Sequence, residues 1–61
     1  MTITATFIGK NSLGYETNEE YKLIISDIKG ISIKRLDGTG KCLYQSLSAF
    51  FNNWDKINII N

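Results

Sequence analysis

The sequence predicts a mainly β fold, in which five antiparallel strands are accompanied by one short helix. Apolar and polar residues alternate with a period of two in several segments before Gln45, which is typical of half-buried strands. The glycines lie between these segments, where the chain must turn. After Gln45 the apolar spacing changes to three and four residues, which indicates a helix.

The first predicted strand covers residues 2–8, and an irregular loop follows at residues 10–18. In the strand, Ile3, Ala5 and Phe7 share one face and threonines occupy the other. The loop combines turn-forming residues with a leucine and a tyrosine, so we expect one of these apolar side chains to hold it against the domain.

Three further strands are predicted in the middle of the chain, at residues 21–26, 31–36 and 41–45. The two glycines of residues 37–40 supply the positive φ angles that a short hairpin loop needs. The last two of these strands are therefore expected to form an antiparallel hairpin. A second tight turn is expected at residues 27–30.

A short helix is predicted at residues 47–53, and a last strand at residues 55–60. The large apolar residues at helical spacing are Leu47, Phe50, Phe51 and Trp54. Ser46 precedes them in the position of an N-cap, whereas Asn52 and Asn53 are poor helix formers that favour an early end. The last strand is short, and we expect it at an edge of the sheet.

We expect the strands to close into a barrel with the helix at one end, because an open sheet this small would leave long unpaired edges. The alternative is an open antiparallel sheet with the helix packed across one face. Both arrangements use the same predicted core, which consists of Ile3, Phe7, Leu23, Ile25, Ile31, Ile33, Leu47, Phe50 and Trp54.

The predicted order, with a long loop after the first strand and a helix before the last, resembles that of SH3-like small barrels. The A-L-Y-D-Y motif, the tryptophan that opens the third strand and the proline of the helical turn are absent, so no peptide-binding residue is transferred from SH3 domains. The segments F-I-G-K-N-S-L-G-Y and C-L-Y-Q-S-L-S-A-F-F-N-N-W also resemble short uncharacterised proteins of bacteria and their phages. That resemblance implies a phage or other mobile-element origin and no known activity.

The 61 residues have room for a single small domain, and a net charge of +1 provides no field that would hold the chain on nucleic acid or a membrane. The sequence opens without a secretory-signal pattern, so we expect a cytoplasmic protein without a membrane partner. One cysteine and no histidine exclude an intramolecular disulfide and remove the commonest metal ligand. We expect no cofactor and no metal.

No segment predicts a catalytic site, and we expect that the protein is not an enzyme. Residues 37–42 end in G-K-C, but Arg35 stands at the position of the first glycine of a phosphate-binding loop, and a strand follows where that loop needs a helix. Cys42 has no histidine to activate it. Glu19 and Glu20 are adjacent, so in an extended chain they point to opposite faces and cannot act as a catalytic pair.

Surplus apolar residues lead to the hypothesis of a small protein-interaction module, which docks onto a protein partner or associates with itself. A two-turn helix cannot bury all of its large apolar residues in a core this small, so Phe51 or Trp54 is expected to stay partly exposed. Tyr15 in the first loop is the third candidate contact. The final strand offers a sheet edge to which another strand can be added.

The alternative function is nucleic-acid binding through Lys34, Arg35, Lys41 and Tyr44. The three cations flank the predicted hairpin on neighbouring strands, and a basic spot beside an aromatic ring is typical of sites for single-stranded nucleic acid. The same residues are also typical of a solvated hairpin. Only the first interpretation predicts an affinity for nucleic acid that falls steeply with salt.

Overall fold

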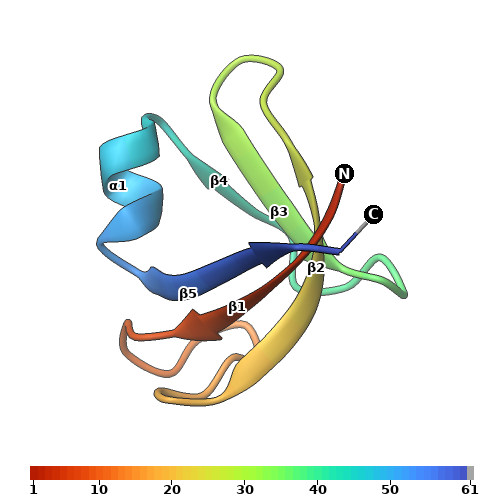
Figure 1. The fold of residues 1–61 in the computed structure, drawn as a ribbon. Coiled ribbons are helices and arrows are strands. Elements are labelled where there is room, and N and C mark those ends of the chain that lie inside the picture. The colour runs from red at the N-terminus through yellow and green to blue at the C-terminus, as the bar shows by residue number, and fades with distance from the viewer. Residues whose placement is uncertain (61) are drawn as a thin grey trace.

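The computed structural model describes residues 1–60 and contains five strands and one helix (Figure 1). In chain order the elements are β1 (Thr2–Phe7), β2 (Glu20–Ser26), β3 (Ile31–Arg35), β4 (Cys42–Tyr44), α1 (Leu47–Phe51) and β5 (Trp54–Ile59). Every strand predicted from the alternation is present within one or two residues of its expected bounds. The hairpin between β3 and β4 and the short helix are also confirmed.

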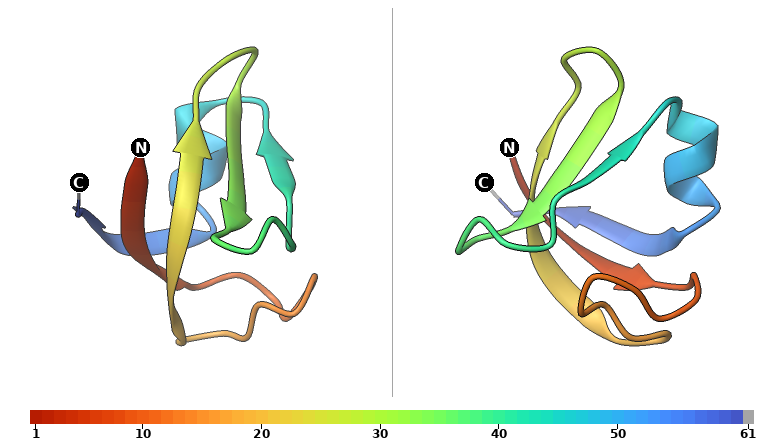
Figure 2. Two further views of the ribbon diagram at one scale, coloured as in Figure 1. Left: turned by 90° about the vertical axis from the view of Figure 1, so that its right-hand side faces the viewer. Right: turned by 180° about the vertical axis from the view of Figure 1, so that it is seen from behind.

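The strands form one antiparallel sheet in the order β4-β3-β2-β1-β5, which makes β4 and β5 its edges. Figure 2 shows the sheet curling, with α1 following β4 and leading directly into β5. No pairing joins β4 to β5 among residues 1–60, so the closed barrel is not confirmed. The open sheet with a packed helix describes the arrangement, because α1 occupies the connection between the two edges.

β1 is hydrogen-bonded on both sides, and its residues alternate between the two neighbours. The N–H of Phe7 donates to the carbonyl of Glu19 beside β2 at 2.9 Å, and the N–H of Ile8 donates to the carbonyl of Asn53 beside β5 at 2.8 Å. Odd-numbered residues of β1 therefore bond toward β2 and even-numbered residues toward β5. A bulge in β5 interrupts this ladder near Lys56, whose φ is 52°.

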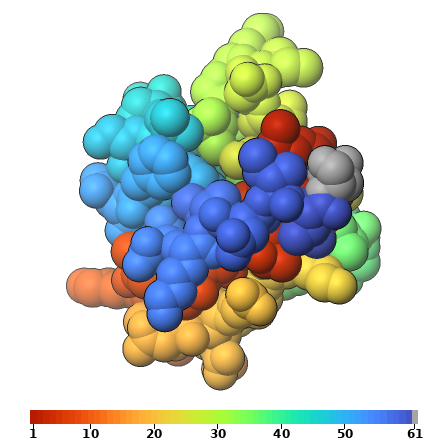
Figure 3. All heavy atoms as spheres, viewed as in Figure 1, coloured from red at the N-terminus to blue at the C-terminus, as the bar shows by residue number. Residues whose placement is uncertain are grey.

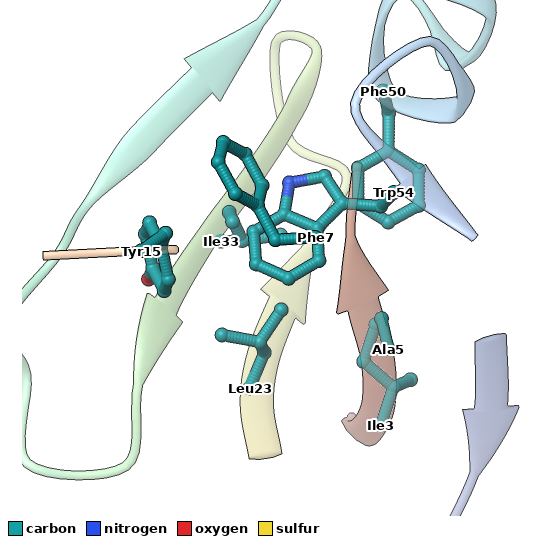
Figure 4. Packing of buried hydrophobic residues seen from close by; sticks show 8 residues of the cluster. All are labelled: Ile3, Ala5, Phe7, Tyr15, Leu23, Ile33, Phe50 and Trp54. Carbon is teal, nitrogen blue, oxygen red and sulfur yellow. The ribbon is translucent and has the colours of Figure 1, made fainter. Parts of the chain in front are cut away.

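The core is built from side chains of the strands, the first loop and α1, which point toward one another (Figure 4). Its buried members are Ile3, Ala5, Phe7, Tyr15, Leu23, Ile33, Phe50 and Trp54. Ile25 and Ile31, which were predicted as core, are half-buried and pack against this cluster. Leu47 was wrongly predicted as core, because a helix this short inserts one large side chain beneath it, and Phe50 fills that place.

α1 begins and ends through local hydrogen bonds. Ser46 is the N-cap, as predicted, and its hydroxyl oxygen accepts from the N–H of Ala49 at 3.1 Å. The helix ends at Phe51, earlier than predicted, and Trp54 already belongs to β5. Within residues 1–60, α1 falls far short of the length that a membrane-crossing helix requires.

Candidate functional site

We call the exposed side chains of Leu47 and Phe51 on α1, together with that of Leu43 on β4, the uncharged surface; the Leu43 side chain lies near Gly30, in the turn between β2 and β3. Leu47, Phe51 and Leu43 are 53%, 51% and 61% exposed, respectively. Leu47 and Phe51 are four residues apart in α1 and so lie on neighbouring turns of the same side of the helix. Figure 3 shows the atoms of α1 and of the segment before it together on one flank of the molecule.

Residues 42–54, which supply this surface, are the longest stretch of the chain without Asp, Glu, Lys or Arg. The exposed polar neighbours of the three apolar side chains in this stretch are neutral: Gln45, Ser46, Ser48 and Asn52. Depletion of charge around exposed aromatic and aliphatic groups is the compositional signature of protein-interface centres. Exposed apolar side chains and absence of charge therefore coincide in this stretch.

We expected either Phe51 or Trp54 to stay partly exposed, and Phe51 is the one that does. Trp54 is only 1% exposed, because β5 begins there and directs the indole into the core. Its ring centroid lies 5.0 Å from those of both Phe7 and Tyr15, and its Nε1–H donates to the hydroxyl of Tyr44 at 3.0 Å. Trp54 therefore offers no surface to a partner, which corrects its assignment as a contact residue.

Tyr15 is likewise a core residue and not a surface contact. Only 2% of it is exposed, and its hydroxyl donates to the carbonyl of Gly40 at 2.8 Å. The tyrosine joins the loop between β1 and β2 to the β3–β4 hairpin. The prediction that an apolar side chain holds this loop is confirmed, and the proposed contact role of Tyr15 is corrected.

Arg35 completes this junction. Its Cζ lies 4.2 Å from the centroid of the Tyr15 ring, and its guanidinium donates to the carbonyl of Leu13 at 2.5 Å and to the hydroxyl of Thr39 at 3.2 Å. A side chain at Gly40 would overlap both Arg35 and Tyr15, so glycine leaves the space that the arginine fills.

The four residues of the nucleic-acid hypothesis do not present one free surface. Lys34 and Lys41 are exposed, but the guanidinium of Arg35 is engaged with Tyr15 and the first loop. Tyr44 is half-buried, and its ring packs edge-on against Phe50 at 5.8 Å. Its hydroxyl accepts from the indole N–H of Trp54, so both the ring and the hydroxyl have contacts within the protein.

Two titratable groups near this region have shifted pKa values. Burial away from water, followed by a hydrogen bond with Cys42, raises the pKa of Tyr44 to about 12, although the hydrogen bond from Trp54 acts in the opposite direction. The pKa of Asp37 is lowered, because its carboxylate accepts from the hydroxyl and the N–H of Thr39. Asp37 thus stabilises the turn of the hairpin.

Leu43 and Leu47 belong to the candidate surface but were not chosen from the sequence. Leu47 was assigned to the core, and Leu43 was given no role. The absence of charge from residues 42–54 was the signal that marks both.

The described residues contain no pocket and no cluster of three or more potential metal ligands. Cys42 is a free, half-buried thiol. No known family model, curated protein or solved structure matches the chain.

Proposed function

We propose that the protein is a small interaction module that binds a partner protein through the uncharged surface of Leu43, Leu47 and Phe51. The observation that carries the proposal is that three large apolar side chains are more than half exposed within the longest uncharged stretch of the chain. Burying such side chains contributes about 1.5–3 kcal/mol each when the burial is complete. The partner that fits is a protein with a neutral, apolar contact face.

The arrangement of the strands supports a second part of the proposal, that the fold is of the SH3-like small-barrel type. The order of elements in such folds is a first strand with a long loop, three meandering strands, a helical turn and a final strand. The order β1-β2-β3-β4-α1-β5, in which β2, β3 and β4 are neighbours in the sheet, agrees with that sequence of elements. The proposal concerns the course of the chain and transfers no binding residue.

Protein binding is favoured over nucleic-acid binding because the two hypotheses use different side chains, and these differ in their exposure and contacts. The nucleic-acid hypothesis depends on Arg35 and Tyr44, which both form contacts within the protein. Protein binding requires exposed apolar groups, and Phe51 is half-exposed within the uncharged stretch of residues 42–54.

Affinity capture with matched variants tests the proposal. The wild type, Phe51→Lys and Ile28→Lys are immobilised and exposed to lysate of the cells in which the protein is made. Ile28 is a suitable control for Phe51 because it is an exposed aliphatic residue in the turn between β2 and β3, outside residues 42–54 and outside α1. We expect the wild type and Ile28→Lys to retain the same protein, and Phe51→Lys to lose it.

Retention of that protein by all three variants would contradict the proposal, as would failure of the wild type to retain any protein. Because the side chain of Phe51 is half-exposed, Phe51→Lys should fold. A circular dichroism melt of each variant checks this directly. Fluorescence anisotropy with a labelled oligonucleotide at low salt tests the nucleic-acid alternative, and binding that falls steeply with salt would support it.

A further inference from the structure

The outer edge of β5 is protected over only part of its length. Its first half carries Asp55, Lys56 and a bulge, which are features that keep sheet edges from pairing with other chains. Residues 57–60 have the sequence I-N-I-I, without charge or proline, and the bulge ends at Ile57. Ile59 in this half is 64% exposed.

The hydrogen-bond pattern shows which backbone groups this edge offers. The N–H of Ile60 donates to the carbonyl of Thr2 at 3.0 Å, and Asn58 lies opposite Thr4. Bonded positions alternate in an antiparallel ladder, so the N–H and C=O groups of Ile59 point away from β1, and so does the C=O of Ile57, because the N–H of the same peptide unit belongs to Asn58 and faces β1. These groups lie on the open side of an edge strand.

We propose that this edge pairs with the same edge of a second copy of the chain, in antiparallel orientation about a two-fold axis at Asn58. In that register Ile57 of one copy lies opposite Ile59 of the other, and each Asn58 lies opposite its counterpart. In each such pair the N–H of Ile59 donates to the C=O of Ile57 in the other copy. The two five-stranded sheets then continue into one sheet of ten strands.

The occupant is a second copy because the register is self-complementary. The residues at the two bonded positions are both isoleucines, so the two-fold axis places the half-buried side chain of Ile57 opposite the exposed side chain of Ile59, a favourable cross-strand combination of β-branched residues. The segment carries no charge, and therefore does not repel its own copy. The other sheet edge, β4, has only three residues, which gives it fewer backbone groups to pair.

This surface is separate from the uncharged surface, and the inference does not rest on the proposed function. Sedimentation velocity of the wild type, Ile59→Pro, Ile59→Lys and Phe51→Lys, from micromolar to millimolar concentration, tests it. Proline at position 59 removes an outward N–H and leaves the bonds from β5 to β1 in place. We expect the wild type and Phe51→Lys to approach the mass of two chains, and Ile59→Pro to dimerise at least about tenfold more weakly.

Ile59→Lys provides a second disruption should the proline variant unfold, because it charges the edge without changing the backbone. A wild type that stays monomeric at millimolar concentration would overturn the proposal. Dimers of Ile59→Lys as tight as those of the wild type would also overturn it. Loss of the dimer in Phe51→Lys with retention in both Ile59 variants would assign self-association to the uncharged surface instead.

Discussion

The guanidinium of Arg35 lies over the ring of Tyr15, with its Cζ 4.2 Å from the ring centroid. This contact joins two parts of the chain that are distant in sequence, the first loop and the β3–β4 hairpin. The hydrogen bonds from Arg35 to Leu13 and from Tyr15 to Gly40 connect the same two parts. Arg35 therefore has a structural role.

Replacing Arg35 with alanine should destabilise the protein. The change removes the cation–π contact and the hydrogen bond to the carbonyl of Leu13, and we expect the free energy of unfolding to fall by about 2 kcal/mol. Lys34→Ala is the matched control, because Lys34 is exposed one residue earlier in the same strand. Urea denaturation measures both, and equal losses in the two variants would contradict the structural role of Arg35.

Alanine at Gly40 should cost more than alanine at Gly38. Both glycines have positive φ, 70° and 88°, so each substitution carries a backbone penalty of about 1–2 kcal/mol. A Cβ at Gly38 meets open space, whereas one at Gly40 overlaps Arg35 and Tyr15. We expect a total loss of at least about 3 kcal/mol for Gly40→Ala. Thermal melts that rank the two variants equally would show that the junction is loosely packed.

Tyr44→Phe should leave the buried indole N–H of Trp54 without its acceptor. An unsatisfied buried donor costs about 1–3 kcal/mol, so the free energy of unfolding should fall by that amount. Tyr21→Phe is the control, because the Tyr21 hydroxyl accepts from the N–H of Glu16 at an exposed position where water can replace it. A Tyr44→Phe variant no less stable than Tyr21→Phe would contradict the importance of the Trp54 hydrogen bond.

The raised pKa of Tyr44 predicts a loss of stability at alkaline pH. In the unfolded chain the phenol ionises near its ordinary value of about 10, whereas the fold holds it neutral up to about pH 12. The contribution of Tyr44 to the free energy of unfolding is therefore unchanged below about pH 10. Between about pH 10 and 12 the free energy of unfolding falls. Burial also raises the pKa of Tyr15, which adds to the loss.

Denaturation of the wild type and Tyr44→Phe across this pH window isolates the contribution of Tyr44. We expect the free energy of unfolding to fall more steeply in the wild type than in the variant, because the variant keeps only the contribution of Tyr15. Parallel pH profiles would show that Tyr44 ionises equally easily in the folded and unfolded states.

The strands and the hairpin could be predicted because their signals are local. The alternation that places Ile3, Ala5 and Phe7 on one face depends only on strand geometry, and all three are buried. The turn at Gly38 and Gly40 likewise follows from the backbone freedom of glycine. Ser46 was identifiable as an N-cap from residue type and position alone.

Trp54 was predicted both as core and as a possible contact, and its core assignment is confirmed, but the hydrogen-bond acceptors of Tyr15 and Trp54 could not be predicted, because they lie in distant segments. Tyr15 finds its hydroxyl acceptor at Gly40, and Trp54 finds its own at Tyr44. Helical spacing grouped Trp54 with Leu47, although α1 ends before the tryptophan. Local periodicity identifies the apolar residues, but the course of the chain decides which of them stay exposed.

Amide spectra of the ¹⁵N-labelled protein, recorded in buffer and in concentrated lysate of the cells that make it, test the central claim most directly. If the uncharged surface binds a partner protein, the signals of residues 43–52 should broaden or shift before those of the rest of the chain. Unchanged spectra, or changes confined to the lysine-bearing strands β2 and β3, would contradict the claim.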